Sequence, residues 1–428
     1  MIKLTEFETK MLNGEMGKLK QKALEKIVQY AKALGAKELC KVTKATLGLG
    51  AQPYLNHIKS DDYNKVFSKV YMGTDEVLDI KNEKFSNSCF CLTCTENCDA
   101  DEYKDLGLKK EFFDKNKAFL EITKHAGVNI ASTCTPYFIG WLPLKGEHFV
   151  TTESSNAMFC NSILGACGNP DGVEAAIWSA ICGRTPKWGF HVSKSRYATH
   201  EFKVECSPKT AKDWDVIGYT IGRLLPSNGL PVITGEFENP STVEIKQLFA
   251  SIATTSGAVM CHIVGMTPEA HTLKMATGNT PVKGRFVISQ KEYDESMMLL
   301  CNETSAVIDF VSLGCPHYSL EEIQKLADYI KGKTIKNGVK LYIWTAYPIK
   351  EMAKINGYLD VIHGSGARIL TNSCPIMVGE TIINKSTGIA LDGAKQAHYI
   401  RSMTDANVYY GDMKQCVNSA ISGKWVLE

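Results

Sequence analysis

Strand-like and helix-like segments alternate along the C-terminal two thirds of this 428-residue chain. Apolar runs at residues 232–234, 306–313 and 340–345 are each followed by a stretch with the spacing of an amphipathic helix. The first two of these helices are expected to begin at Ser241 and Ser319. The alternation predicts an α/β fold with mainly parallel sheets flanked by helices. In such sheets, binding sites form at the carboxyl ends of the strands.

The bulk composition is that of a globular protein with two or three packed domains. Apolar residues make up 44% of the chain and charged residues 22%, which argues against disorder and coiled coil. The chain has 48 basic and 46 acidic residues, and a net charge of +2 provides no electrostatic footprint for nucleic acid or an anionic membrane. No signal-peptide layout and no apolar run of about 18 residues is present, so we expect a cytoplasmic protein.

Three of the 15 cysteines, Cys134, Cys315 and Cys374, are each followed by proline within two residues. Two of them also follow strand-like apolar runs, at residues 307–313 and 368–370. Proline ends a strand and helps to fix a turn, which would expose each thiol at a strand end. Three thiolates brought together in this way suit an iron–sulfur cluster, in which one iron could act as a Lewis acid. Three buried thiols beside turns are the alternative interpretation.

A second group of cysteines competes with this trio as a metal site. Residues 89–98 contain Cys89, Cys91, Cys94 and Cys98, and four cysteines within ten residues are typical of a zinc or iron–sulfur loop. Their spacing differs from that of paired zinc knuckles. The segment could equally be a cysteine-rich loop beside the active site. A metal site here would indicate a non-catalytic metal-binding or redox module instead of an enzyme.

Short polar side chains are dense between residues 146 and 169. Ser154, Ser155 and Asn161 lie in this stretch, and such groups can hold a carboxylate or phosphate together with backbone amides. Helix capping would explain any one of them. Arg184 could bind a carboxylate through a bidentate fork, and a surface ion pair is the equally simple alternative. The stretch therefore predicts one wall of a site for an anionic substrate.

The order of these motifs resembles the aconitase X family. The matching blocks are Thr-Cys-Thr-Pro-Tyr at 133–137, Gly-Glu-His at 146–148, Glu-Ser-Ser at 153–155, Asn-Ser at 161–162, Gly-Arg-Thr-Pro at 183–186, Gly-Met-Thr-Pro-Glu-Ala at 265–270, Gly-Cys-Pro-His at 314–317, and residues 364–375. They run in order from about residue 125 to 376, and the N-terminal third matches more loosely.

The resemblance implies an aconitase-like body and a hydro-lyase that carries an iron–sulfur cluster. Cys134, Cys315 and Cys374 match the family's cluster cysteines, on which a 2Fe-2S, 3Fe-4S or 4Fe-4S cluster could be built. The family's two known activities dehydrate cis-3-hydroxy-L-proline, giving Δ1-pyrroline-2-carboxylate, and mevalonate 5-phosphate. Both reactions remove a proton alpha to a carboxylate and expel a β-hydroxyl group.

Two segments depart from the pattern of the mevalonate 5-phosphate enzymes and favour cis-3-hydroxy-L-proline. Those enzymes have an Asn-Pro-containing loop where this chain has Cys94 and Thr95. They have a Ser-Gly-Val-Ser type turn where this chain has Gly48, Gly50 and Gln52, which lack the full pattern of a nucleotide loop. We expect these residues to contact the substrate, together with Ser154, Ser155, Asn161 and Arg184.

The resemblance also implies a small swivelling domain, for which this chain has no room after its last helix. We therefore expect a separate small subunit, which would supply the catalytic base as a serine. No nucleic-acid or membrane partner is expected. The expected parts of the chain are an N-terminal α/β part at 1–130 with substrate-side loops, a central α/β part at 131–285 with Cys134, and a C-terminal α/β part at 286–428 with Cys315 and Cys374.

Overall fold

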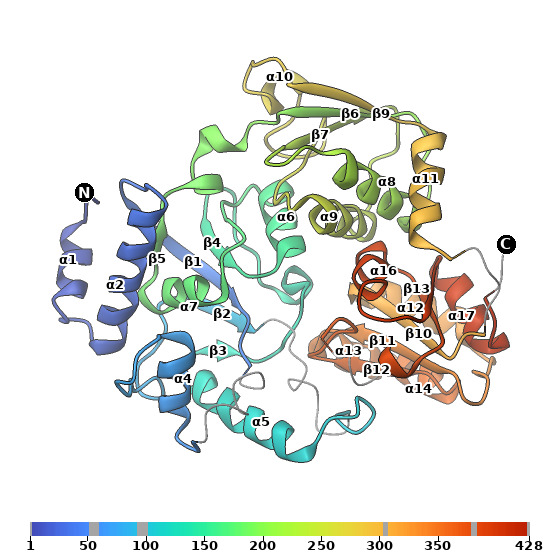
Figure 1. Ribbon diagram of the computed structural model, residues 1–428, viewed down its shortest axis with the longest axis horizontal. Helices are drawn as coiled ribbons and strands as arrows, with labels where there is room; N and C mark the ends of the chain where they lie inside the picture. The colour runs from blue at the N-terminus through green and yellow to red at the C-terminus, as the bar shows by residue number, and fades with distance from the viewer. Residues whose placement is uncertain (1, 51–59, 92–101, 303–306, 378–382, 426–428) are drawn as a thin grey trace.

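Three α/β units follow one another along the chain (Figure 1). The structure is a computed structural model that describes residues 2–50, 60–91, 102–302, 307–377 and 383–425. Each unit contains one sheet of mainly parallel strands with helices packed beside it. The predicted α/β class with mainly parallel sheets is therefore confirmed. Within the described ranges, no helix is both long enough and apolar enough to span a membrane.

The first unit is built on a sheet in the order β3-β2-β1-β4, with β5 paired to β1 as the antiparallel strand. Its strands are β1 (Leu39–Leu47), β2 (Ser88–Cys91), β3 (Val128–Asn129), β4 (His148–Thr151) and β5 (Arg184–Pro186). Its helices are α1 (Glu6–Leu12), α2 (Lys18–Ala33), α4 (Tyr63–Tyr71), α5 (Lys110–His125), α6 (Ser154–Ser162) and α7 (Val173–Cys182).

The second unit has a fully parallel sheet in the order β8-β7-β6-β9. Its strands are β6 (His200–Val204), β7 (Pro231–Gly235), β8 (His262–Ile263) and β9 (Gly284–Ile288). Its helices are α8 (Ala211–Leu224), α9 (Thr242–Ser256), α10 (Leu273–Ala276) and α11 (Gln290–Leu300). Helices α8 and α9 pack against each other and lie on the side of the sheet that faces the other two units (Figure 1).

The third unit has a parallel sheet in the order β12-β11-β10-β13-β14. Its strands are β10 (Phe310–Tyr318), β11 (Lys340–Thr345), β12 (Arg368–Thr371), β13 (Gly388–Leu391) and β14 (Asn407–Tyr410). Its helices are α12 (Leu320–Ile330), α13 (Tyr347–Ile355), α14 (Tyr358–Gly364), α16 (Ala394–Ile400) and α17 (Met413–Ser422). All nine residues of β10 are buried, as expected for a central strand covered on both faces.

The helix starts expected at Ser241 and Ser319 agree with the structure. Each serine is the N-cap of its helix, and each forms a capping box with a glutamate three residues later. In contrast, the expected boundary between residues 130 and 131 lies inside the first sheet, because β4 and β5 pair with β1. The expected boundary at 285 lies inside β9. Long-range strand pairing sets these limits, and no linker in the sequence marks them.

Asp215 of α8 connects the second unit to the third. This side chain is 1% exposed and accepts hydrogen bonds from the Ser251 hydroxyl, the Ala394 backbone N–H (2.7 Å) and the Tyr410 hydroxyl (2.9 Å). Ser251 belongs to α9, whereas Ala394 begins α16 and Tyr410 ends β14. Burial raises the pKa of Asp215 from 3.8 to about 6, although the three donors partly oppose this shift.

The raised pKa predicts how Asp215 affects stability as pH changes. The folded protein holds this proton more tightly than the unfolded chain, so the contribution is complete below about pH 4 and lost as pH rises through about 6. The Asp215→Asn variant has no such proton. The melting temperature of the wild type, relative to that variant, is therefore expected to fall between pH 4.5 and 6.5. The exposed Asp294→Asn variant serves as control, and a pH-independent difference for Asp215→Asn would contradict the prediction.

Candidate functional site

Segments from the first and third units line a cavity of about 350 Å³, and Cys134, Cys315 and Cys374 are all among its walls. Cys134 follows β3, Cys315 lies near the end of β10, and Cys374 comes three residues after β12. Each cysteine is therefore at or beyond the carboxyl end of a parallel strand, where α/β proteins place their sites. A larger cavity of about 720 Å³, beside α5, has none of these cysteines in its walls.

His317 connects the three cysteine segments. Its backbone N–H donates to Cys134 Sγ at 3.3 Å. Its ring contacts Thr133 and Ser373, the residues that precede Cys134 and Cys374. Nε2 lies 2.8 Å from the Ser373 carbonyl oxygen, and Nδ1 lies 3.0 Å from Thr133 Oγ1. Because a carbonyl oxygen only accepts, Nε2 carries the ring hydrogen and Nδ1 accepts from the threonine. Burial lowers the pKa of His317 to about 4, so the ring is neutral at pH 7.

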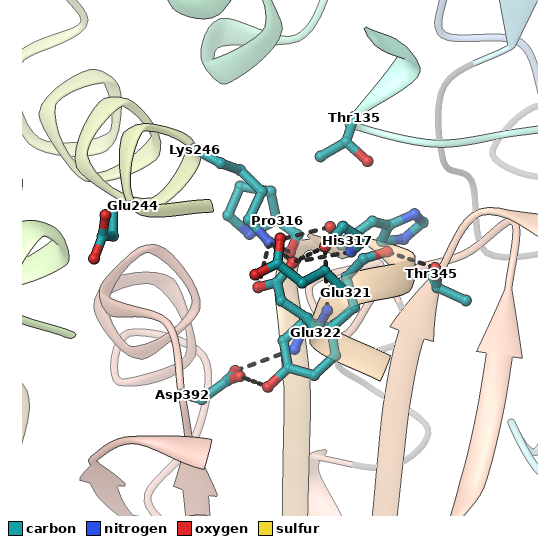
Figure 2. Close-up of polar contacts among 12 residues, drawn as sticks. Thr135, Glu244, Lys246, Pro316, His317, Glu321, Glu322, Thr345 and Asp392 are labelled. Carbon is teal, nitrogen blue, oxygen red and sulfur yellow. Dashed lines mark hydrogen bonds and ion pairs between the residues drawn. The ribbon is translucent and has the colours of Figure 1, made fainter. Parts of the chain in front are cut away.

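Lys246 of α9, in the second unit, holds residues 314–317, the segment that carries Cys315. Figure 2 shows its side chain directed at the carbonyl oxygens of Pro316 and His317, each 3.3 Å from Nζ. The same ammonium group is 2.7 Å and 2.8 Å from the two carboxylate oxygens of Glu322, at the start of α12. Lys246 is 1% exposed, so these partners take the place of water around its ammonium group. The second unit thus positions Cys315 although it contributes no cysteine to the cavity.

Asp392 also holds the segment at residues 314–317. Its carboxylate accepts from the Gly314 backbone N–H at 3.1 Å and from the Tyr318 hydroxyl (Figure 2). A third donor is Gln396 Nε2, at 3.1 Å. Gly314 has φ +97°, and its Cα is so close to the Trp344 carbonyl oxygen that an added Cβ would lie 2.4 Å from it. The turn before Cys315 therefore requires glycine.

Lys395 and Glu153 form an ion pair in the wall of the cavity. Lys395 Nζ lies 2.6 Å from Glu153 Oε1, and the side chains are 12% and 21% exposed. Burial alone would raise the pKa of Glu153, but Lys395 and hydrogen bonds from Ser155 lower it below its ordinary value. Burial disfavours the charge on Lys395, whereas Glu153 and the thiols of Cys315 and Cys134 raise its pKa. Both groups are therefore ionised at neutral pH.

The donor set suits an iron–sulfur cluster. Burial raises the pKa of Cys134 to about 12 and that of Cys315 well above its ordinary value, so neither thiol ionises without a compensating positive charge. Iron supplies that charge, and thiolate sulfur is the ligand that such clusters prefer. The Lys395 ammonium adds a second cation beside the thiols. The three cysteines are thus chemically suited to hold the group that the sequence predicts.

The other expected site residues have different positions. Gly48 and Ser154 line the cavity, while Ser155 donates to Glu153 at 2.5 Å and lies 3.5 Å from Lys395 Nζ. Gly50 exchanges backbone hydrogen bonds with the Tyr71 hydroxyl and is not among the cavity walls. Gln52, Cys94 and Thr95 lie outside the described residues, as do Cys98 and most of the cysteine-rich segment.

Asn161 and Arg184, expected as substrate contacts, have structural partners instead. The Asn161 amide donates to the carbonyls of Gly168 and Val259 and accepts from the Gly168 N–H, so it joins the first unit to the second. Arg184 Nε lies 2.7 Å from Glu8 Oε1, and the guanidinium group covers the Phe7 ring. Neither side chain lines the cavity. Their partners come from distant parts of the chain, which local composition cannot reveal.

The sequence interpretation missed Lys395, Asp392 and Lys246. Lys395 and Asp392 lie just after β13, so the rule that sites form at strand ends could have identified them. Lys246 lies within α9 among apolar residues and resembles an ordinary surface lysine until its burial is known. Only the packing of the units reveals its role.

Removing the His317 ring is expected to weaken retention of the cluster without unfolding the chain. Partners that orient metal ligands typically contribute about 10–100-fold to metal affinity. We therefore expect His317→Ala to lose iron to a chelator faster by about that factor. His200→Ala is the matched control, because His200 is also buried and also has its Nδ1 against a threonine hydroxyl, at 2.8 Å. Equal iron release from both variants would contradict this role.

Comparison with known proteins gives consistent matches along the chain. Family models for the first, third and second domains of aconitase X match residues 1–194, 308–422 and 198–298. The crystal structure of the holo-form of aconitase X from Thermococcus kodakaraensis has a TM-score of 0.80 at 26% identity. That match covers 98% of this chain and 100% of the other.

Relatives with assigned activities are dehydratases. A phosphomevalonate dehydratase large subunit from Methanosarcina mazei is 28% identical over 98% of each chain. Another such subunit, from Thermococcus kodakarensis, is 33% identical over 68% of this chain and 73% of its own. A cis-3-hydroxy-L-proline dehydratase from Hypocrea jecorina is 28% identical over 99% of this chain and 69% of its own length.

Proposed function

Because this chain belongs to the aconitase X family and is a dehydratase, we propose that it removes water from a β-hydroxy carboxylate, with cis-3-hydroxy-L-proline as substrate. The observation that carries the proposal is the convergence of Cys134, Cys315 and Cys374 on one cavity that also contains an ion pair. These cysteines would hold the iron–sulfur cluster. When bound, that cluster supplies a Lewis acid that makes the substrate hydroxyl a better leaving group.

The residues of this chain would orient the substrate. Lys395 offers its ammonium group to the substrate carboxylate, which favours loss of the proton alpha to that carboxylate. Glu153 offers a carboxylate to a protonated ring nitrogen and keeps Lys395 charged. His317 remains neutral and holds the cysteine segments together, so it takes no proton during the reaction. We assign the base that takes the alpha proton to a partner subunit.

The charge of the cavity favours a zwitterionic substrate. Apart from the three cysteines and the cluster that they would hold, the described walls contribute one positive charge from Lys395 and one negative charge from Glu153, so this pair is neutral. A hydroxy amino acid carries the same balance of charges. A substrate with both a carboxylate and a phosphate would bring a negative charge near −3, which needs additional cations. The described part of the cavity is thus better matched to cis-3-hydroxy-L-proline.

Phosphomevalonate is the second candidate substrate. The observation in its favour is that this chain matches 98% of the length of the Methanosarcina mazei phosphomevalonate dehydratase large subunit. The name of that relative also supports a small subunit as the partner that completes the site. Cations for the phosphate would then have to come from that partner or from residues outside the described ranges.

A single anaerobic assay tests these proposals. The chain would be purified with a small swivel-domain subunit and supplied in parallel with cis-3-hydroxy-L-proline and mevalonate 5-phosphate. Loss of the hydroxyproline, together with the visible absorption of a cluster, is the expected result. Loss of only the phosphate compound would overturn the substrate and keep the mechanism. Full activity of the large chain alone would contradict the need for a partner.

A further inference from the structure

Cys40, His148 and His191 form a second group of metal-binding side chains in the first unit. One ligand atom from each lies within 4.8 Å of the other two. Cys40 is near the start of β1, His148 begins β4, and His191 ends a short 3-10 helix after β5. The two histidines are 43 residues apart, and Cys40 lies more than a hundred residues before both, so the fold of the first unit brings the three together.

The spacing suits one tetrahedral ion. The Nδ1 atoms of His148 and His191 are 3.1 Å apart. Two nitrogen ligands of zinc, each about 2.0–2.1 Å from the metal, lie about 3.3 Å apart in a tetrahedral site. The Cys40 thiol has a single weak contact among the described atoms, at 3.7 Å from the Thr185 carbonyl oxygen. Cysteine sulfur and histidine nitrogen are both ligands that zinc takes in proteins.

The burial of the group is compatible with a bound ion. His191 is 3% exposed, so a ligand on its ring would be held away from water. His148 is only partly buried, which provides a route for an ion to enter.

Asp171 supplies a matching charge. This side chain is 6% exposed, and neither carboxylate oxygen has a partner within the described part of the chain. Burial raises its pKa to about 8, and its charge contributes to the raised pKa of Cys40. A divalent ion on the Cys40 thiolate would leave one positive charge, which an ionised Asp171 would cancel. Ionisation of the buried Asp171 carboxyl group and ionisation of the Cys40 thiol both become favourable when the same ion is bound.

This group is separate from the cavity with Cys134, Cys315 and Cys374. His148 begins β4, whereas the cavity is lined by Thr152 just beyond the end of that strand. Four residues of strand span about 13 Å. Likewise, Cys40 lies near the start of β1, whereas Gly48, which lines the cavity, lies just beyond its end. The two groups therefore occupy opposite ends of the same strands.

We propose that Cys40, His148 and His191 bind a zinc ion that joins β1, β4 and the segment after β5. The fourth position of the tetrahedron is available to water. The ion is structural, because it lies away from the reacting groups and stabilises the sheet from which the substrate cavity is built.

Metal analysis of the full chain, purified without a histidine tag or chelator, tests the proposal. We expect about one zinc per chain, in addition to any iron. Cys40→Ser and His191→Ala should each lower the zinc content below about a tenth of that value. Cys182→Ser is the matched control, because Cys182 is also buried and its thiol contacts a backbone carbonyl at 3.6 Å. It should retain the zinc.

Cobalt gives a second measurement. Adding Co²⁺ to the iron-depleted chain should produce the near-ultraviolet band of a thiolate-bound cobalt ion and the visible bands of tetrahedral geometry. His148→Ala, at the partly exposed edge of the group, should lose these bands even if the buried variants fail to fold. Zinc that persists in Cys40→Ser, or a wild type that binds neither metal, would overturn the proposal. Neither result depends on the dehydratase activity.

Discussion

Replacing Cys315 by serine is expected to lower kcat/KM of the dehydration by at least about 10³-fold. Lewis-acid stabilisation by a bound metal contributes several kcal/mol, and each 1.36 kcal/mol corresponds to a factor of ten in rate. Cys315 is 6% exposed, and its neighbours Gly314 and Pro316 are held through their backbones by Asp392 and Lys246. No other described cysteine in that segment could replace it. Iron content and visible absorption should fall together with the activity.

The control for this experiment is Cys416→Ser. Cys416 is buried in the same unit, and its thiol contacts the Gly411 carbonyl oxygen at 3.9 Å, away from the cavity. It should keep its iron and most of its activity. The prediction fails if Cys315→Ser retains the cluster absorption and turns over at a rate similar to Cys416→Ser. That result would return the cysteine-rich segment at residues 89–98 to consideration as the metal site.

Replacing Lys395 by methionine is expected to affect both stability and activity. Breaking a buried ion pair by removing one partner costs about 3–5 kcal/mol, because the Glu153 carboxylate is left uncompensated. The same change removes the cation that we assign to the substrate carboxylate. Loss of such a charged contact should lower kcat/KM by about 10²-fold or more. Urea unfolding and steady-state kinetics measure the two effects.

A double variant separates these effects. Glu153→Gln with Lys395→Met removes both charges, so it should recover much of the lost stability. It should not recover the activity, because the substrate still lacks its cation. Recovery of activity in the double variant would mean that Lys395 only neutralises Glu153. Lys325→Met, which breaks an exposed Lys–Glu pair on α12, should cost less than about 1 kcal/mol and serves as control.

The fold class could be predicted because its signals are local. Apolar runs, helical spacing and the capping serines at 241 and 319 are each visible within a few residues of sequence. The unit boundaries could not be predicted in this way. The return of β4 and β5 to pair with β1 depends on contacts more than 100 residues apart, for which the sequence has no local marker.

The candidate site was predictable to a similar degree. Proline beside each of Cys134, Cys315 and Cys374 identified residues that the fold brings to one cavity. The Glu153–Lys395 pair spans 242 positions of sequence, and Lys246 reaches Glu322 across 76. Asn161 and Arg184 have partners away from the cavity, since a polar residue in a recognisable motif can also serve the packing of the chain. Charge partners at long range decide which of these roles a side chain has.

The order of Cys134, Cys315 and Cys374 along the chain also limits when the proposed cluster could be inserted during synthesis. Cys134 emerges from the ribosome long before Cys374, and Lys395 follows later still. Domains generally fold in order from the N-terminus during synthesis. The first unit, with Cys134, can therefore fold before Cys315 and Cys374 have been synthesised. Delivery of the proposed cluster would have to wait until nearly the whole chain has been made and the third unit has docked. Cluster insertion would then be a late step of maturation.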